Sequence, residues 1–183
     1  RSPSRGLGDV YKRQDNYNNV LEYGYGYAAN PKALRVSLND NLNNAGTEPA
    51  SKSHSPIIGF AYDGNPIYGA FGYENPLDST SSIIRMTSSY SINGNRSEGP
   101  DLTTYPIGTF VNDYTYTHKS GTLDENNGRF CITPEFPKGT YAYFITIDSN
   151  QVPQYPYILG ENFYSLPVDL SLIHISEPTR RTP

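Results

Sequence analysis

The stretch TYAYFITI, Thr140–Ile147, has the strongest strand pattern in the chain. Its residues are mostly aromatic or β-branched, which suits the pleated surface of a sheet, and the turn-forming tripeptide PKG precedes it. Because side chains alternate between the two faces of a strand, Tyr141 and Tyr143 share one face and Ala142 and Phe144 share the other. Neither face is charged, so we predict a central strand that is buried on both sides.

A second stretch, GFAYDGNPIYGAFGY at Gly59–Tyr73, indicates a hairpin. Two apolar runs, Ile57–Tyr62 and Ile67–Gly72, flank the sequence DGNP. Asp-Gly between apolar runs is typical of a tight hairpin turn, because both residues tolerate a positive φ. We therefore interpret the stretch as scaffold: Asp63 holds the turn, the tyrosines pack, and the glycines let the hairpin bend closely.

Glycine, proline and asparagine interrupt the rest of the chain too often for long helices. No segment keeps an apolar stripe at the 3.6-residue period of an extended helix. The expected fold is mainly β, a single compact domain of short antiparallel strands with long ordered loops. Further strands are predicted at Ala33–Leu38, Ser82–Ile92, Thr109–His118 and Arg129–Thr133, with a long loop at Asn93–Pro106.

The two ends of the chain are related through the genetic code. Ser4–Gln14 read forward has codons complementary to Leu170–Arg180 read backward; Ser4 and Arg180, for example, pair as TCT with AGA. An inverted repeat therefore bounds the gene, and the DNA that it implies resembles the transposase end and adapter of sequencing libraries. We expect residues 1–14 and 170–183 to be adapter-derived tails that are not part of the fold. The residues between them are expected to be an internal fragment of a longer protein. Within that fragment, 15–53 is expected to be a partial N-terminal segment or extension and 54–169 the β domain.

The charge of the chain argues against nucleic-acid binding. The whole chain has 14 basic and 18 acidic residues and a net charge of −4. Six of the basic and two of the acidic residues lie in the expected tails, so residues 15–169 carry a net charge of −8. A nucleic-acid surface needs a basic stripe instead. The single cysteine excludes an intrachain disulfide, and no apolar run is long enough to predict a membrane span.

Three segments in this order resemble the YHYH family: HSPIIGFAYDGNPIYGAFGY at His54–Tyr73, LDENNGRFCITPEFPKGTYAYF at Leu123–Phe144 and QYPYILG at Gln154–Gly160. More narrowly, they are similar to its versions in structural proteins of tailed phages from marine bacteria. The resemblance covers about His54–Ser165. It implies a set of scaffold positions: Asp63, Gly64, Asn65, Pro66, Tyr68, Gly69, Asp124, Gly128, Arg129, Tyr141, Tyr143, Tyr155 and Tyr157.

The chain departs from the Tyr-His-Tyr-His motif that gives the family its name. The corresponding stretch, Tyr141–Phe144, reads Tyr-Ala-Tyr-Phe, so both tyrosines are kept and both histidines are absent. A metal-binding or proton-transfer role of those histidines is therefore not carried over. Asn126 stands where the family's LDECNGR has its cysteine.

Three acidic residues, Asp63, Asp124 and Glu125, are candidates for a glycosidase pair, which needs two carboxylates facing each other across a cleft. Adjacent residues point apart on a strand, and Asp-Gly suits a turn, so we favour a structural role for them. Calcium is the alternative cofactor, because two loops supply hard oxygen ligands, although their spacing is not that of an EF-hand: Asp63, Asn65, Asp124, Asn126 and Asn127.

Two histidines and one cysteine complete the candidates. His54 and His118 form a metal pair or a catalytic base only if the fold brings them together, and Cys131 between apolar neighbours is expected to be a small buried residue. The tyrosines form either an aromatic contact patch for glycans or proteins, or part of the core: Tyr62, Tyr68, Tyr73, Tyr155 and Tyr157.

The resemblance, together with the missing catalytic constellation and the two absent histidines, implies a non-enzymatic β module of a larger phage virion structural protein that acts in assembly or surface attachment. Its expected location is the virion or, alternatively, the extracellular space. The expected partners are other virion proteins or host-surface glycans, and not nucleic acid. A calcium- or carbohydrate-binding module is the runner-up, and a hydrolase is the third hypothesis.

Overall fold

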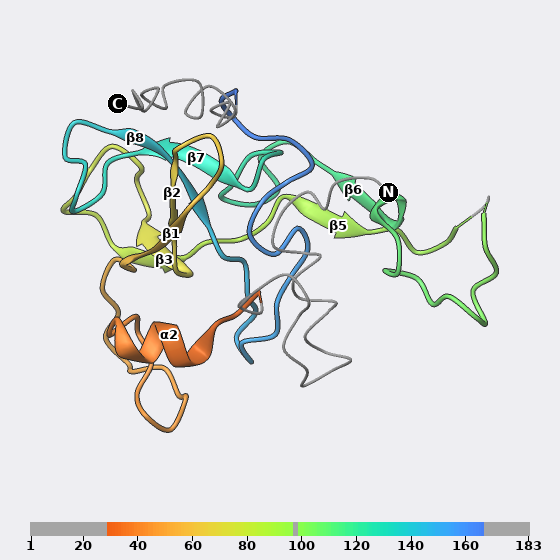
Figure 1. Cartoon of the computed structure of the whole chain (residues 1–183), viewed down its shortest axis with the longest axis horizontal. Helices are drawn as coiled ribbons and strands as arrows, with labels where there is room; N and C mark the ends of the chain where they lie inside the picture. The colour runs from red at the N-terminus through yellow and green to blue at the C-terminus, as the bar shows by residue number, and fades with distance from the viewer. Residues whose placement is uncertain (1–28, 97–98, 167–183) are drawn as a thin grey trace, which may run out of the picture.

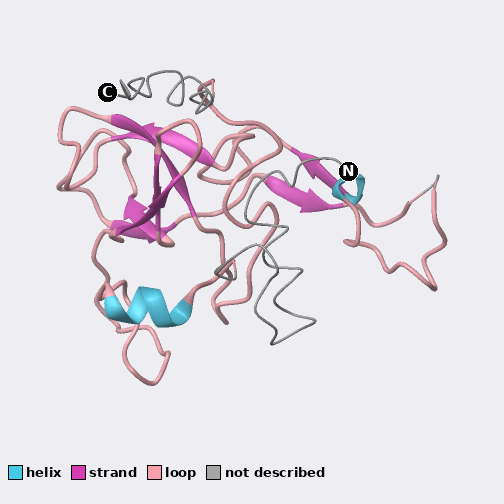
Figure 2. Ribbon diagram, in the orientation of Figure 1, coloured by secondary structure: helices cyan, strands magenta, loops and turns pink. Residues whose placement is uncertain are grey.

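The computed structural model describes residues 29–96 and 99–166, which form a mainly β fold as the sequence predicts. Its largest sheet has the strand order β1-β2-β8-β7 (Figures 1 and 2). The expected tails at 1–14 and 170–183 lie outside the described residues. The four strands are β1 Ile57–Phe60, β2 Pro66–Tyr68, β8 Thr140–Phe144 and β7 Gly128–Cys131.

Strand β8 lies in the middle of this sheet, as its sequence predicts. Every residue from Tyr141 to Ile147 is buried. Strand β7 runs antiparallel to β8, with Cys131 opposite Thr140, whereas β2 runs parallel to it, with Tyr68 opposite Phe144. The parallel pair departs from the expected antiparallel pairing, because the chain makes a long excursion after β2 and returns in the same direction.

Two small antiparallel sheets accompany the large one: β3 Phe71–Tyr73 with β4 Ile83–Arg85, and β5 Tyr90–Ile92 with β6 Tyr114–Tyr116. The predicted strands Ile67–Gly72 and Ser82–Ile92 are therefore each divided between two sheets. The reason is a shared bend, where Met86 is fully buried and its backbone N–H donates to Ala70 O at 2.8 Å.

The predicted strand Ala33–Leu38 is wrong, because Lys32–Ser37 forms the short helix α2 (Figure 1). Arg35 is fully buried in it, and its Nε donates to Asp40 Oδ2 at 2.6 Å. An extended chain would hold residues five apart at roughly 16 Å, so this buried ion pair favours the helical turn. No helix among the described residues is long and apolar enough to cross a membrane.

The predicted strand Thr109–His118 begins as a 3₁₀ turn, Val111–Asp113, before β6. Asp113 is buried, and its Oδ2 accepts the backbone N–H groups of Gly108 at 2.9 Å and Phe110 at 3.0 Å. Arg96 reaches the same carboxylate, with its Nη2 2.6 Å from Oδ2. This hub shapes the long connection between β5 and β6, which extends away from the main sheet (Figure 1). We call residues 90–96 and 99–116 the arm.

Candidate functional site

Tyr141 and Tyr143 project from one face of β8, and each hydroxyl ends on an aspartate. Tyr141 Oη donates to the Asp124 carboxylate, 2.8 Å from either oxygen, and Tyr143 Oη donates to Asp63 Oδ2 at 2.7 Å. The two rings meet edge to face, with 5.2 Å between centroids. One strand thereby ties down two loops that are far apart in sequence. We call these four residues the tyrosine–aspartate array.

Asp63 also organises its own turn. Its Oδ1 accepts the backbone N–H of Asn65 at 3.1 Å, and its Oδ2 accepts Asn65 Nδ2 at 2.8 Å. Gly64 supplies the positive φ of the turn, +83°, and Pro66 begins β2 immediately afterwards. The hairpin predicted at Asp63-Gly64 is confirmed, since β1 and β2 pair antiparallel.

Asp124 organises the LDENNGR loop in the same way. Its Oδ1 accepts the backbone N–H groups of Asn126 at 2.9 Å and Gly128 at 3.2 Å. Glycine is required at position 128, because a Cβ there would collide with the ring and hydroxyl of Tyr141. The loop motif and the β8 tyrosine are therefore matched in shape as well as in hydrogen bonding.

The YPYILG segment closes on the same loop. Asn127 is fully buried, and its Nδ2 donates to Phe144 O at 2.9 Å and Ile158 O at 3.2 Å. Gly160 N donates to Asn126 O at 2.9 Å, and a Cβ at Gly160 would strike the loop backbone. Three motif segments thus pack as one unit around β8.

Residues 163–165 cover the array. Tyr164 lies flat on Tyr141, with 3.7 Å between ring centroids and 3° between planes. Its backbone N–H donates to Tyr143 Oη at 2.8 Å, and Ser165 N donates to Asp63 Oδ2 at 3.2 Å. Tyr141 and Tyr143 are therefore buried, while Tyr164 is 55% exposed. Sequence reasoning missed Tyr164 and Ser165, because they lie outside the motif segments.

The Tyr143–Asp63 hydrogen bond joins two groups whose pKa values are shifted in opposite directions. Burial raises the pKa of the Tyr141 and Tyr143 hydroxyls above their ordinary value. Partial burial also acts to raise the pKa of Asp63, but hydrogen bonds from Tyr143 and Asn65 outweigh it and leave that pKa below its ordinary value. A general acid needs a raised carboxyl pKa instead. The geometry suits a fixed hydrogen bond between a neutral phenol and an ionised carboxylate.

The opposite face of β8 carries Ala142 and Phe144, the positions of the two absent histidines. Both side chains are fully buried in a cluster with Tyr68, Met86 and Cys131. Burial raises the pKa of the Cys131 thiol, whereas a nucleophilic cysteine needs a lowered pKa. The prediction that Cys131 is a buried small residue is confirmed.

His54 packs against this second face of β8. Its ring centroid is 5.1 Å from that of Tyr68 and 6.1 Å from that of Phe144. Nδ1 lies 2.8 Å from Ser55 O and donates to it, which leaves the buried Nε2 without a hydrogen-bond partner among the described residues. Burial lowers the pKa of His54. His118 is instead exposed in the turn that follows β6, where its Nδ1 lies 3.2 Å from the Tyr116 hydroxyl, so the two histidines occupy different parts of the fold.

Arg129 and Tyr68, two of the scaffold positions, join the large sheet to its surroundings. Arg129 Nη2 donates to Tyr73 O, and its guanidinium lies 5.6 Å from the centroid of the Phe144 ring. The buried Tyr68 hydroxyl lies 2.9 Å from both Thr133 Oγ1 and Glu135 Oε2. Both side chains have packing and hydrogen-bonding partners that explain their presence.

The candidate tyrosines do not form one patch. Tyr68 is fully buried, Tyr62 is 70% exposed, and Tyr73 packs on the His54 ring at 4.9 Å. Tyr155 and Tyr157 belong to a second group at the base of the arm, where Tyr155 stacks on Tyr114 at 4.1 Å. Core packing and surface exposure therefore both occur. The second group also includes Tyr90 and Tyr116.

The calcium candidates are divided between two turns. Asp63 and Asn65 bond to each other in one, while Asp124 holds Asn126 N and Tyr141 in the other. In residues 29–96 and 99–166, no group of three or more His, Cys, Asp or Glu residues gathers to hold a metal ion. The carboxylates of both turns accept hydrogen bonds from the local backbone and from the tyrosines of the array.

A buried carboxylate that sequence reasoning missed anchors residues 29–53 to the sheet. Asp40 is fully buried, accepts Arg35 Nε at 2.6 Å, and accepts the hydroxyl of Ser55. A Cβ at Gly69 would collide with this carboxylate. Gly69, the second glycine of the DGNPIYG motif, therefore allows the Asp40 carboxylate to approach the backbone closely and does not form a turn. An aspartate in an asparagine-rich stretch carried no signal that could have revealed this contact.

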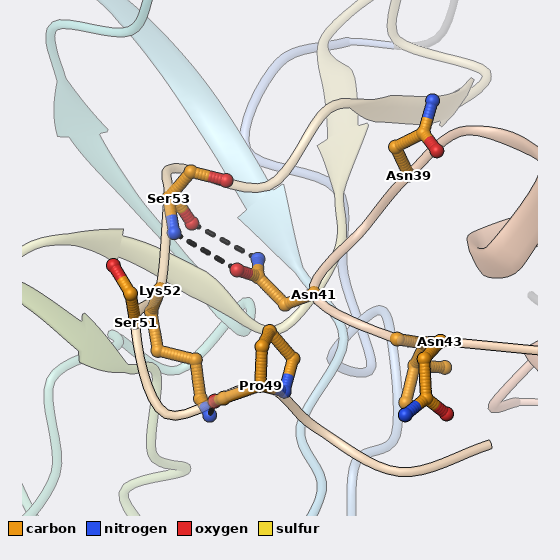
Figure 3. Close-up of a pocket in the computed structure, with 8 residues that line it drawn as sticks. Asn39, Asn41, Asn43, Pro49, Ser51, Lys52 and Ser53 are labelled. Carbon is orange, nitrogen blue, oxygen red and sulfur yellow. Dashed lines mark hydrogen bonds between the residues drawn. The ribbon is translucent and has the colours of Figure 1, made fainter. Parts of the chain in front are cut away.

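A shallow cavity of about 250 Å³ lies in the loop after α2 (Figure 3). Asn41 crosses the loop there, since its Nδ2 donates to Ser53 O at 2.9 Å and its Oδ1 accepts Ser53 N at 2.8 Å. Lys52 pairs with Glu48 at 3.6 Å. These polar groups hold the loop closed, because they bind to other residues of the same loop.

A family model described as YHYH protein matches residues 19–157, about three quarters of the chain. The chain belongs to the YHYH protein family. The YHYH match begins well before His54, so it takes in the Asp40 anchor together with both tyrosines of the array. Comparisons with curated proteins and with solved structures find no match.

Proposed function

We propose that the chain is a non-enzymatic β module of a larger phage virion structural protein, acting in assembly or surface attachment. One observation carries the proposal: both motif carboxylates, Asp63 and Asp124, are hydrogen-bonded by tyrosine hydroxyls and backbone N–H groups. These acids hold loops in place around β8. The likeness of the three motif segments to structural proteins of marine tailed phages supplies the virion context.

A hydrolase is the competing proposal, and the array argues against it. A glycosidase uses one carboxyl group as an acid and a second as a nucleophile or base. Asp63 has a lowered pKa, and residues 163–165 cover the array. An ionised carboxylate held by several hydrogen bonds is suited to structural bonding rather than to protonating a leaving group.

Virion association is tested by mass spectrometry of phage particles purified from the source of the gene. Trypsin should release Phe130–Lys138, because Arg129 precedes it and Lys138 ends it. We expect this peptide to co-purify with capsid and tail proteins through a density gradient. Its presence in the cellular secreted fraction, and its absence from the particles, would overturn the proposal.

A further inference from the structure

An exposed aromatic surface lies directly outside the tyrosine–aspartate array. Tyr62 is 70% exposed and meets Phe163 edge to face at 6.2 Å, and the neighbouring Tyr164 is 55% exposed. Tyr164 is held flat by its stacking on Tyr141 and by its backbone bond to Tyr143. Its outward face is therefore fixed before any ligand arrives, which lowers the entropic cost of binding. We call Tyr62, Phe163 and Tyr164 the aromatic platform.

Three polar groups adjoin the platform and have unused hydrogen-bonding capacity. An ionised carboxylate can only accept hydrogen bonds, so the side-chain nitrogen of Asn65 is the atom that faces Asp63. The side-chain oxygen of Asn65 is therefore available to accept a hydrogen bond from a ligand. That oxygen accepts no hydrogen bond from the described residues, and the exposed Ser165 hydroxyl donates none to them. Asp63 Oδ1 accepts a single hydrogen bond, from Asn65 N.

The combination of groups selects the chemistry of the ligand. A pyranose ring has an apolar face that stacks on an aromatic side chain, and a rim of hydroxyl groups that donate to carboxylate and amide oxygens. The ionised Asp63 would repel a uronic or sialic acid, and none of the residues named in the surface is basic. A neutral sugar is the ligand that satisfies both the aromatic and the acidic parts.

We propose that the aromatic platform, with Asp63, Asn65 and Ser165, is a binding site for neutral glycans. This inference rests on the proposed function, because it specifies the surface to which an attachment module would bind. The ring of Tyr164 provides one stacking face and the exposed ring of Tyr62, which contacts Phe163, provides a second. The three polar groups hydrogen-bond to the sugar hydroxyls.

Affinity electrophoresis of the full chain tests this proposal. Native gels contain mannan, dextran, xylan or galactan as neutral probes, and alginate or hyaluronate as acidic probes. We expect retardation by at least one neutral polysaccharide and none by the acidic ones. Tyr62→Ala and Tyr164→Ala should each weaken binding at least tenfold, as truncation of a central aromatic contact typically does.

Matched variants separate binding from folding. Tyr105 is 44% exposed on the arm, so Tyr105→Ala should bind like the original chain. Tyr164→Phe keeps the ring on Tyr141 and should retain most of the binding. The proposal is overturned if no neutral polysaccharide retards the chain, if only acidic ones do, or if Tyr62→Ala and Tyr164→Ala bind normally.

The result is separable from the virion proposal. If the peptide is found in virions but the chain binds no glycan, the virion proposal stands with an assembly role and the glycan site is refuted. Glycan binding without virion peptides would leave the site and remove the virion role.

Discussion

At the scale of single residues, the two glycines of the DGNPIYG motif have different physical roles. Gly64 takes the positive φ of the hairpin turn, whereas Gly69 lets the Asp40 carboxylate approach the backbone. Gly59, in the neighbouring strand β1, has no heavy atom within 4 Å of where its Cβ would lie. Only the first of these roles could be read from the sequence, because a close approach depends on a partner far away in the chain.

Gly69→Ala is therefore predicted to destabilise the fold by about 1–3 kcal/mol, the usual cost of overpacking. Asp40 cannot move aside, because Arg35 and Ser55 hold it in a fully buried position. Urea denaturation should show a lower midpoint with an unchanged slope. Gly59→Ala is the matched control and should change stability by less than about 0.5 kcal/mol; equal effects of the two substitutions would contradict the Asp40 contact.

His54 is predicted to make stability depend on pH. Its pKa in the folded chain is lowered below the ordinary 6.5, mainly by burial. Below that value the unfolded chain binds a proton that the folded imidazole resists, so the free energy of unfolding falls as pH falls and is fully regained at higher pH. Thermal melting between pH 7.5 and 5 should show this loss.

The control for this prediction is the second histidine. His54→Gln should flatten the dependence in this pH range, while His118→Gln, at an exposed position, should keep it. If His118→Gln flattened it instead, the assignment to His54 would be wrong.

At the scale of elements, the arm depends on one partly buried ion pair, Arg96–Asp113. Asp113 holds Arg96 and two backbone N–H groups, and Arg96 Nη1 also donates to Pro100 O at 2.8 Å and Tyr105 O at 3.1 Å. The connection between β5 and β6 contains no strand among its described residues. Side-chain bonds to a single carboxylate therefore replace a sheet ladder there.

Asp113→Ala is predicted to open the arm and leave the main sheet folded. Chymotrypsin should then cut faster after Phe110, since an opened loop is the preferred site of proteolysis. Asp101→Ala removes an exposed turn acceptor from the same loop and should leave the cleavage rate nearly unchanged. Equal protection in Asp113→Ala would show that other contacts hold the arm.

The elements that the sequence predicts well are those whose signal is local. The β1–β2 hairpin follows from Asp-Gly between apolar runs, and β8 follows from its alternating aromatic and β-branched residues. Helix α2 was missed because it is only six residues long, and the Arg35–Asp40 ion pair that fixes the chain there could only be seen in three dimensions. Likewise the motif aspartates were recognised as turn residues, while their tyrosine partners could only be seen in three dimensions.

At the scale of the whole molecule, calcium is predicted not to stabilise the fold. Asp63 and Asp124, the charged oxygen ligands of the two candidate turns, already accept hydrogen bonds from Tyr143, Tyr141 and the local backbone. Binding of one calcium ion, at a free concentration 100 times its Kd, would add about 2.7 kcal/mol to the free energy of unfolding. We expect no change in Tm on adding calcium chloride, relative to sodium chloride of equal ionic strength. A rise that a chelator reverses, and that Asp63→Asn or Asp124→Asn abolishes, would support the calcium-binding alternative.

The parallel pairing of β2 with β8 has a consequence for synthesis on the ribosome. Strand β2 ends at Tyr68, but the strand that completes its pairing ends only at Phe144. The β1–β2 hairpin must therefore leave the exit tunnel long before its neighbour is translated, with one edge unpaired and open to association with other chains. A nascent chain stalled before Thr140 should remain sensitive to protease and prone to aggregate, and release of the last strand should complete the sheet in one late step.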